Sequence, residues 1–282
     1  MIKSEAFARI CFFGDHQDYL NLPVISGTID RKITLTATPN SEDKYILHLL
    51  DLDSVIVINI NENFNNIEAE DYFRSSLSIL QQAGLVFEQG YTVEITGNIP
   101  VNAGVSSSSA LVVAWIRFLV QAQKTPVAVS SIQIGQWAYA AEVGFFNQPG
   151  GLMDQYTIAQ EGLLYIDTQT GTTSRLKPHL GQLVVAESGI AKETLTVLQN
   201  AREYGQKAIE AVQQVNPNFE LYTAEPKDYA LYLDKYNYLK PKLDEKYGEG
   251  WPETLTPEQK NSDPYINLLR ETIVEIMSVP TE

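Results

Sequence analysis

Segment 98–110 holds a proline, a glycine and four consecutive serines directly before an apolar stretch. A helix that begins at Ser106 to Ser109 would present unpaired backbone N–H groups and the positive end of its dipole, which suits a phosphate group. Gly104 would let the backbone approach an anion closely, and a serine hydroxyl can ligate Mg²⁺. Capping the helix is the alternative, but one serine suffices for that. The common P-loop pattern is absent from the sequence.

A second polar cluster, segment 14–19, directly follows the apolar strand expected at 8–13. It offers an acid, an imidazole, an amide, an acid and a phenol in consecutive positions. Such a set of donors and acceptors suits the hydroxyl groups of a polyol. A metal site and an ordinary polar turn are the two alternatives. The candidate binding residues of this cluster are Asp15, His16 and Asp18.

A third cluster combines Glu142 with the turn-forming segment 147–155. Gly150 and Gly151 precede Asp154 and are expected to place it on a tight turn that faces a cleft. A pair of carboxylates of this kind could hold Mg²⁺ and act as a general base. The alternative is that Asp154 caps a following helix.

The elements that must position these clusters follow from periodicity. Alternating apolar residues predict strands over 33–37 and 91–95, with further strands at 45–50, 55–60, 163–166 and 183–186. Helical spacing predicts helices over 69–85, 106–123 and from 131 through 142, the second one apolar nearly all round. Beyond residue 190 the sequence predicts mainly helix, including apolar stripes at 198–212 and 266–276. We therefore divide the chain into domains at 1–185 and 186–282.

Composition excludes several classes of protein. With 20 basic and 35 acidic residues the net charge is −15, which argues against nucleic-acid binding. Cys11 is the only cysteine, so neither an intrachain disulfide nor a multi-cysteine zinc site can form. The most apolar run, 110–120, is broken by Arg117 and is much shorter than the ~20 residues that span a membrane. Without a secretory signal at residues 1–8, a cytoplasmic location is expected, and no oligomeric state is predicted.

Taken together, and in their order along the chain, the three clusters resemble the motifs of the GHMP small-molecule kinases, and most closely those of the galactokinase branch. Segment 9–19 is similar to the galactokinase Gly-Arg-Val-Asn-Leu-Ile-Gly-Glu-His-Thr-Asp-Tyr, with Asp15 in place of the glutamate. Segment 100–110 resembles the phosphate loop Pro-x-x-x-Gly-Leu-Ser-Ser-Ser-Ala, with one extra serine. Segment 150–156 is similar to Cys-Gly-Ile-Met-Asp-Gln-Phe. The resemblance covers residues 4–190, and the glycine-rich third motif of the family is missing.

The resemblance implies an α+β fold of two domains. The N-terminal domain would contain a mixed sheet of the ribosomal protein S5 domain 2-like type, and the C-terminal domain would be helix-rich and incomplete. It further implies ATP and Mg²⁺ as cofactors, Asp154 and Arg9 as catalytic residues, and Ser108 and Glu142 as ligands of the metal. The implied phosphate-binding residues are Pro100, Gly104, Val105, Ser106, Ser107, Ser108 and Ser109, and the implied sugar-binding residues are Asp15, His16, Asp18, Gly151 and Asp154.

The activity implied by the resemblance is ATP-dependent phosphorylation of a monosaccharide, at the anomeric hydroxyl. Two alternatives remain at this point. One is a kinase for another hydroxylated metabolite. His16 and Asp18, at galactokinase-like positions, argue against mevalonate or homoserine as that metabolite. The other is an inactive sensor of sugar or nucleotide, which the missing third motif keeps open.

Overall fold

The computed structural model describes residues 1–64, 66–100, 103–178, 180–181, 183–186, 194–213, 217–224, 238, 241–242 and 244–246. The chain forms two compact units, Met1–Arg202 and Glu203–Glu282. All three polar clusters lie in the first unit. The domain boundary expected between 185 and 186 stays a prediction, and the apolar stripe expected at 266–276 lies outside the described residues.

The first unit is built on a seven-stranded mixed sheet in the order β4-β3-β5-β2-β6-β7, with β1 paired to β2. β3 and β5 run parallel to each other, and the other pairs are antiparallel. The long β2 joins two parts of the sheet, because its first residues pair with β6 and its last residues pair with β5. The strands are β1 (Ile2–Phe13), β2 (Val24–Pro39), β3 (Lys44–Leu49), β4 (Ser54–Asn59), β5 (Tyr91–Gly97), β6 (Leu163–Asp167) and β7 (Thr172–Leu176).

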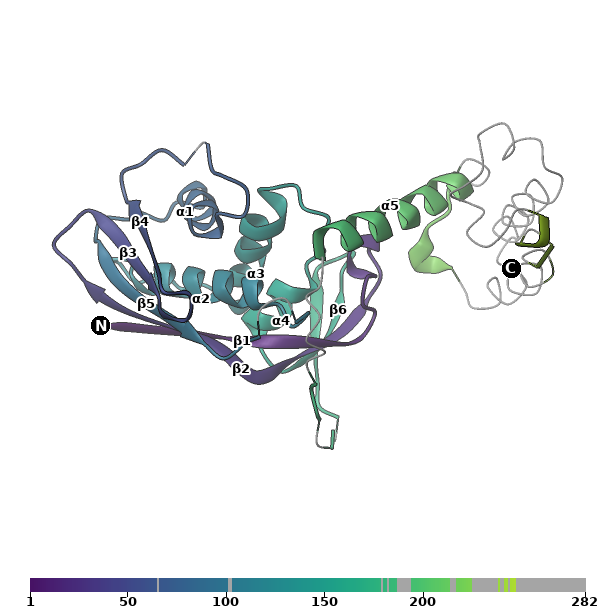
Figure 1. Ribbon diagram of the computed structural model, residues 1–282, viewed down its shortest axis with the longest axis horizontal. Coiled ribbons are helices and arrows are strands. Elements are labelled where there is room, and N and C mark those ends of the chain that lie inside the picture. Colours follow the sequence, from purple (N-terminus) through teal and green to yellow (C-terminus); the bar gives the residue numbers. More distant parts are fainter. Residues whose placement is uncertain are drawn as a thin grey trace. The chain divides into compact units, whose positions relative to one another are not determined.

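The helices α1 to α4 lie on one face of this sheet (Figure 1). The result is the mixed α+β architecture that the sequence predicts. The helices are α1 (Tyr72–Gln82), α2 (Ser107–Gln121), α3 (Ser131–Tyr139), α4 (Met153–Gln160) and α5 (Thr194–Gln213). Shorter turns are η1 (Asp18–Leu20), η2 (Leu50–Leu52), η4 (Leu221–Thr223) and the π-helical turn η3 (Ala140–Gly144), which continues α3.

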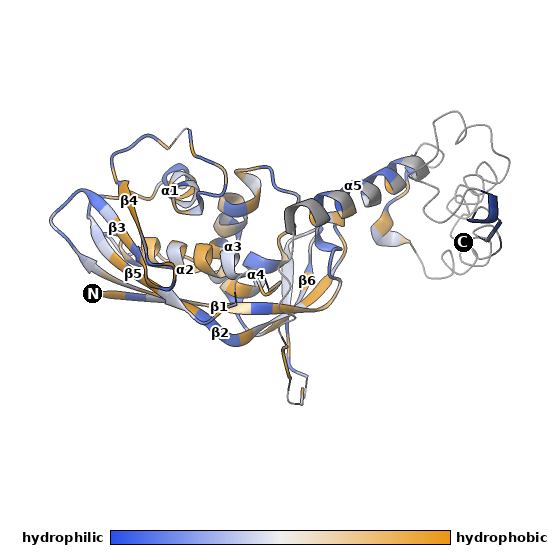
Figure 2. Cartoon of the chain, viewed as in Figure 1, coloured by the Kyte–Doolittle hydropathy of each residue, from blue (hydrophilic) through white to orange (hydrophobic). Residues whose placement is uncertain are grey.

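The core between sheet and helices is organised around the apolar helix α2. Trp115 is fully buried and meets the rings of Phe73 and Tyr45 edge-on, with centroid distances of 5.4 Å to both. Its Nε1–H donates a hydrogen bond of 3.1 Å to the carbonyl oxygen of Phe73, so the polar edge of the ring is satisfied inside the core. Figure 2 shows apolar residues along the strands and on the helices that cover them. The sequence-based prediction of a central buried helix is therefore confirmed.

Three features of the fold differ from the sequence-based expectations. No strand forms at 183–186, where Val184 is 92% exposed, and β7 occupies the sheet edge beside β6. A turn closed by the Asp167 side chain, which accepts from two backbone N–H groups, joins these two strands. The polar sequence of β7 gave no apolar alternation to detect. The helix α4 was expected only in the alternative that Asp154 caps a following helix, and Asp154 lies in its first turn rather than on a preceding tight turn.

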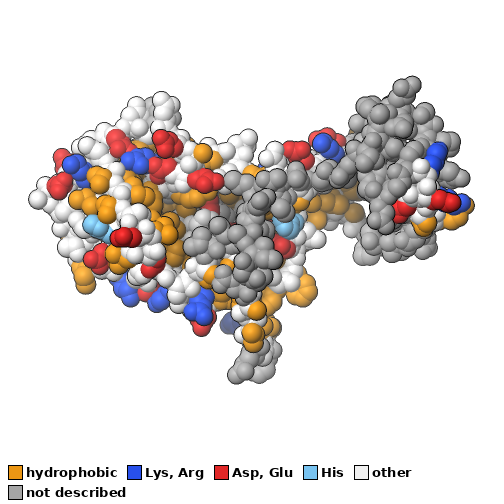
Figure 3. Space-filling view, in the orientation of Figure 1, with side chains coloured by type: hydrophobic (Ala, Val, Ile, Leu, Met, Phe, Trp, Pro, Cys, Tyr) orange, Lys and Arg blue, Asp and Glu red, His pale blue; other side chains and the backbone are white. Residues whose placement is uncertain are grey.

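Two observations bear on possible partners. None of the described helices is long and apolar enough to cross a membrane. On the face shown in Figure 3, basic side chains are interspersed with acidic ones among the described residues.

Replacing Trp115 with alanine should lower the free energy of unfolding by about 3–5 kcal/mol, because it leaves a cavity in the core and removes a buried donor. Urea denaturation followed by circular dichroism would measure the change. Val57→Ala is the matched control, since that side chain is 49% exposed and should cost less than about 0.5 kcal/mol. Equal effects of both changes would show that α2 is not the centre of the core.

Candidate active site

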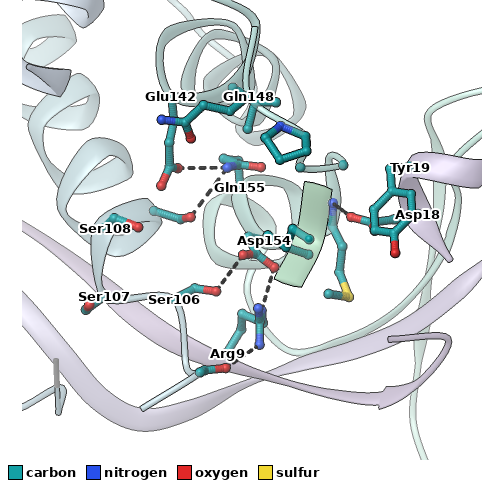
Figure 4. Close-up of a pocket in the computed structure, with 18 of the residues that line it drawn as sticks. Arg9, Asp18, Tyr19, Ser106, Ser107, Ser108, Glu142, Gln148, Asp154 and Gln155 are labelled. Carbon is teal, nitrogen blue, oxygen red and sulfur yellow. Dashed lines mark hydrogen bonds and ion pairs between the residues drawn. The ribbon is translucent and has the colours of Figure 1, made fainter. Parts of the chain in front are cut away.

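One cavity of about 540 Å³ brings together residues of all three polar clusters (Figure 4). It lies among β1, the start of α2, the π-helical turn η3 and the start of α4. Segments that are more than a hundred residues apart in the sequence therefore line the same cavity. The residues expected from the sequence that line this cavity are Arg9, Asp15, His16, Asp18, Gly104, Ser106, Ser107, Ser108, Ser109, Glu142, Gly151 and Asp154.

An ion pair between Arg9 and Asp154 lies at the centre of the site. Arg9 Nε donates to Asp154 Oδ1 at 2.6 Å. The β1–β2 register shifts between Phe7 and Arg9, where the additional residues lie on β2. The backbone N–H of Arg9 donates to the Val105 carbonyl oxygen at 3.3 Å, which ties β1 to the loop before α2. Burial opposes the charge of Arg9, but the Asp154 carboxylate outweighs it and the pKa of Arg9 is raised.

Ser106 connects the same carboxylate to the start of α2. Its hydroxyl donates to Asp154 Oδ2 at 2.6 Å, so both carboxylate oxygens have a protein donor. Although Ser106 occupies the N-cap position of α2, its side chain makes no capping bond, and its backbone is left-handed with φ of 60°. Such a conformation is uncommon for a residue with a Cβ and is found at functional sites. The capping interpretation is thus wrong for this serine.

The loop before α2 turns at Gly104, whose φ of +77° favours glycine. Arg9 Nη1 donates to the Gly104 carbonyl at 2.9 Å, which ties this loop to the central ion pair. Ser108 is exposed toward the cavity while Ser109 is buried. Two expected phosphate-binding residues, Pro100 and Val105, do not line this cavity; they line a second one of about 860 Å³.

Glu142 contributes a second carboxylate from the π-helical turn η3, a type of helical distortion that often occurs at functional sites. The side chain is buried, and this burial raises the pKa of its carboxyl group. Hydrogen bonds from Gln155, Ser108 and Ser109 oppose that shift, while the charge of Asp154 adds to it. Gln155 Nε2 donates to Glu142 Oε2 at 2.7 Å.

The oxygen donors of this region fit a magnesium ion. Glu142 supplies a carboxylate and Ser108 a hydroxyl at the same wall of the cavity. No group of three or more metal-binding side chains occurs among the described residues. Mg²⁺ usually keeps several waters and takes one or two carboxylates together with substrate phosphates, so it does not need such a cage.

A third carboxylate, that of Asp18, lies on the other side of Asp154 from Glu142 in Figure 4. Burial raises its pKa to about 6, and the negative charge of Asp154 adds to the shift. Met153 N donates to Asp18 Oδ2 at 3.4 Å. A Cβ atom on Gly151 would overlap the Asp18 carboxyl group, so only glycine fits beside it.

The remaining residues of the second cluster lie at the same end of the cavity. His16 has a left-handed backbone with φ of 64°, and its Nδ1 lies 3.2 Å from the Tyr19 hydroxyl. Asp15 Oδ2 is 3.7 Å from His16 Nε2, and its side chain is 61% exposed. These groups present hydroxyl, imidazole and carboxylate functions next to Asp18.

Several lining residues were not predicted. Gln148 and Gln155 belong to motif segments that the sequence analysis quoted, so their polarity was the available signal. Tyr72, whose hydroxyl accepts from Gln148 Nε2 at 3.2 Å, lies at the start of α1. Nothing in the local sequence linked α1 to the site. Tyr19, which also lines the cavity, belongs to the second polar cluster, and the unpredicted lining residues are Glu70, Tyr72, Val143, Gln148, Pro149, Gly150, Met153, Gln155 and Leu198.

Residues 71–162 match the family model described as "GHMP kinases N terminal domain". This segment is therefore similar to the N-terminal domain of the GHMP kinases. This segment contains the start of α2, the turn η3 and the start of α4, which are three of the four walls of the cavity. The resemblance to GHMP kinases that the motifs predicted is therefore confirmed.

Curated relatives of the GHMP kinase domain include galactokinases. The galactokinase of Haemophilus influenzae (strain PittGG) is 28% identical over 200 residues, covering 69% of this chain and 52% of the relative. That of Thermococcus kodakarensis is 27% identical over 212 residues, covering 73% of this chain and 58% of the relative. The chain thus spans about half the length of the curated relatives it matches.

Solved structures show the same fold. The crystal structure of Lactococcus lactis galactokinase complexed with galactose gives a TM-score of 0.63 at 18% identity, covering 95% of this chain and 76% of that chain. A mevalonate kinase crystal structure gives a TM-score of 0.54 at 18% identity, covering 88% of this chain and 83% of that chain. This chain therefore has the same fold as these two kinases.

The raised pKa of Asp18 predicts a pH dependence of stability. Its folded pKa of about 6 exceeds the ordinary value of 3.8, so ionisation of Asp18 lowers the free energy of unfolding. This loss of stability grows as the pH rises from about 4 to 6 and is complete above about 6. Asp18→Asn removes this penalty. Between pH 4.5 and 7.5, the free energy of unfolding of the variant should rise relative to that of the original chain by about 2 kcal/mol.

Denaturant titrations at the two pH values would measure that difference. Asp15→Asn is the control, because the Asp15 side chain is 61% exposed and should show no comparable trend. A pH-independent difference between the Asp18 variant and the original chain would contradict the burial of an ionisable group at this position.

Proposed function

We propose that this chain is a kinase that transfers a phosphoryl group from ATP to a monosaccharide, at the anomeric hydroxyl. The observation that carries the proposal is the position of Asp154. It lies in one cavity between the hydroxyl-binding candidates around Asp18 and the serine-rich start of α2. A sugar at one side and a phosphate chain at the other would meet at this carboxylate.

Asp154 would accept the proton of the attacking hydroxyl. The bonds from Arg9 and Ser106 hold its carboxylate at the cavity wall, where a substrate hydroxyl would approach it. Arg9 would hold the carboxylate in place and stabilise negative charge on the attacking oxygen or on the transferring group. Its guanidinium stays charged throughout, which suits this role.

The start of α2 would bind the phosphates of ATP. Its backbone N–H groups and dipole favour an anion, and the loop at Gly104 is open toward the cavity. Ser108 and Glu142 would hold Mg²⁺, which neutralises charge on the phosphates. Transfer of a phosphoryl group depends mainly on positioning and charge neutralisation, and the cavity offers donors for both.

Asp15, His16, Asp18 and the region of Gly151 would bind the sugar hydroxyls. Galactose is the first substrate to test, because relatives named galactokinase align with this chain and one solved neighbour was crystallised with galactose. A site built to hydrogen-bond hydroxyl groups rejects analogues that lack one of them much more strongly than a pocket that senses size alone.

The deciding experiment is ATP consumption by the full chain with Mg²⁺ and a panel of hexoses, pentoses and sugar acids. Turnover with one sugar and a phosphorus NMR signal of a sugar 1-phosphate would support the proposal. Phosphorylation at another carbon would correct the position of transfer. Saturable binding of sugar or nucleotide without turnover would replace the kinase with a sensor.

Asp154→Asn should lower kcat about 10²- to 10⁴-fold while leaving ATP binding within a few-fold, because the general base is lost. Steady-state kinetics and nucleotide titration would measure both quantities. Asp43→Asn, at an exposed position outside the cavity, is the control. A variant that keeps more than about a tenth of the original kcat would exclude Asp154 as the base.

Ser108→Ala should raise the Mg²⁺ concentration needed for half-maximal activity, because one oxygen donor is lost at an exposed position. Its melting temperature should stay near that of the original chain. Ser78→Ala, on α1 outside the cavity, controls for loss of a serine hydroxyl. Should Ser106→Ala alone change the Mg²⁺ requirement, the metal-binding serine would have been assigned wrongly.

A further inference from the structure

We propose that Gln155 is a positioning residue, whose side-chain amide fixes the Glu142 carboxylate in the orientation that holds a divalent cation. The inference deepens the proposed function and rests on it. The glutamine follows Asp154 in the sequence and bonds Glu142, so it connects the two carboxylates that the proposed mechanism uses.

The contacts of Gln155 point to Glu142. The glutamine follows Asp154 on α4 and is only 2% exposed. Its Nε2 donates to Glu142 Oε2 at 2.7 Å and approaches Ser109 Oγ at 3.4 Å, as the dashed lines in Figure 4 show. Consecutive residues of α4 therefore make the hydrogen bonds that hold the base and the candidate metal ligand.

The donors around Glu142 orient its charge without neutralising it. In the described part of the chain, its hydrogen-bond partners are the Gln155 amide and the hydroxyls of Ser108 and Ser109. A buried carboxylate normally pairs with a cationic side chain or a metal. A lysine at position 155 would compete with a metal ion for this charge, whereas a neutral amide leaves it available.

The other end of the amide argues against a role in packing alone. Gln155 Oε1 is buried and has no hydrogen-bond partner among the described residues. An unsatisfied buried oxygen lowers stability, and an apolar side chain of the same length would avoid that cost. The feature that distinguishes glutamine from such a side chain here is the donor to Glu142.

The test measures Mn²⁺ binding directly, by the loss of the free Mn²⁺ EPR signal, in the presence of a non-hydrolysable ATP analogue. Gln155→Met keeps the side-chain length and removes the amide. We expect it to weaken Mn²⁺ binding about 10- to 100-fold, the range typical of residues that orient a metal ligand. The KM for the sugar should stay within about twofold, because Gln155 acts through Glu142.

A double-mutant cycle shows whether the effect passes through Glu142. The variant with both Gln155→Met and Glu142→Gln should bind Mn²⁺ no more weakly than Glu142→Gln alone. Gln160→Met is the matched control: it lies on the same helix, and its Oε1 accepts from Thr173 outside the cavity. Gln155→Leu provides a second apolar variant if the methionine variant does not fold.

The outcomes separate the inference from the proposed function. Unchanged Mn²⁺ affinity in a folded Gln155 variant would overturn the inference while leaving the kinase proposal intact. Independent, multiplying effects of the Gln155 and Glu142 changes would overturn it as well. If the original chain with the ATP analogue bound no Mn²⁺, the metal site of the proposed function would fail together with the inference.

Discussion

The ion pair between Arg9 and Asp154 is the interaction on which the candidate site depends. It joins β1 to the first turn of α4, 145 residues away in the sequence. Ser106 adds the start of α2 to the same carboxylate, and Arg9 also binds the loop at Gly104. Breaking a largely buried pair leaves an uncompensated charge, which is strongly destabilising. The walls of the cavity are therefore held at the point where chemistry would occur.

Around this pair, the site concentrates more negative charge than its own residues neutralise. Burial raises the pKa values of both Asp18 and Glu142, and the charge of Asp154 adds to each shift. The hydrogen bonds to these two carboxylates come from neutral groups. Such an arrangement costs stability in the free protein and is typical of sites that bind cations or transfer protons. A hydrated metal ion and a hydroxyl proton would each relieve part of that cost.

Backbone geometry also shapes the candidate site. Ser106 and His16, which both line the cavity, adopt left-handed conformations. The Ser106 hydroxyl bonds Asp154 from another segment of the chain, whereas His16 Nδ1 lies beside the Tyr19 hydroxyl of its own segment. Gly151 lies so close to Asp18 that no side chain fits at its position. Strain of this kind persists only where surrounding structure enforces it. The sheet and the helices packed on it supply that enforcement.

The sequence by itself determined the buried helix α2 through its apolar periodicity. Short motifs that resemble those of the GHMP kinases supplied the mixed α+β class and most residues of the cavity. Tertiary structure decided which residues of the motifs meet. The ion pair partner of Arg9 and the amide that holds Glu142 follow from contacts across the chain, which no local pattern encodes. The edge strand β7 escaped prediction, and the short helix α4 was expected only as an alternative, because neighbouring elements rather than their own periodicity stabilise them. The exclusion of Pro100 and Val105 from the main cavity likewise depends on how the loop before α2 folds.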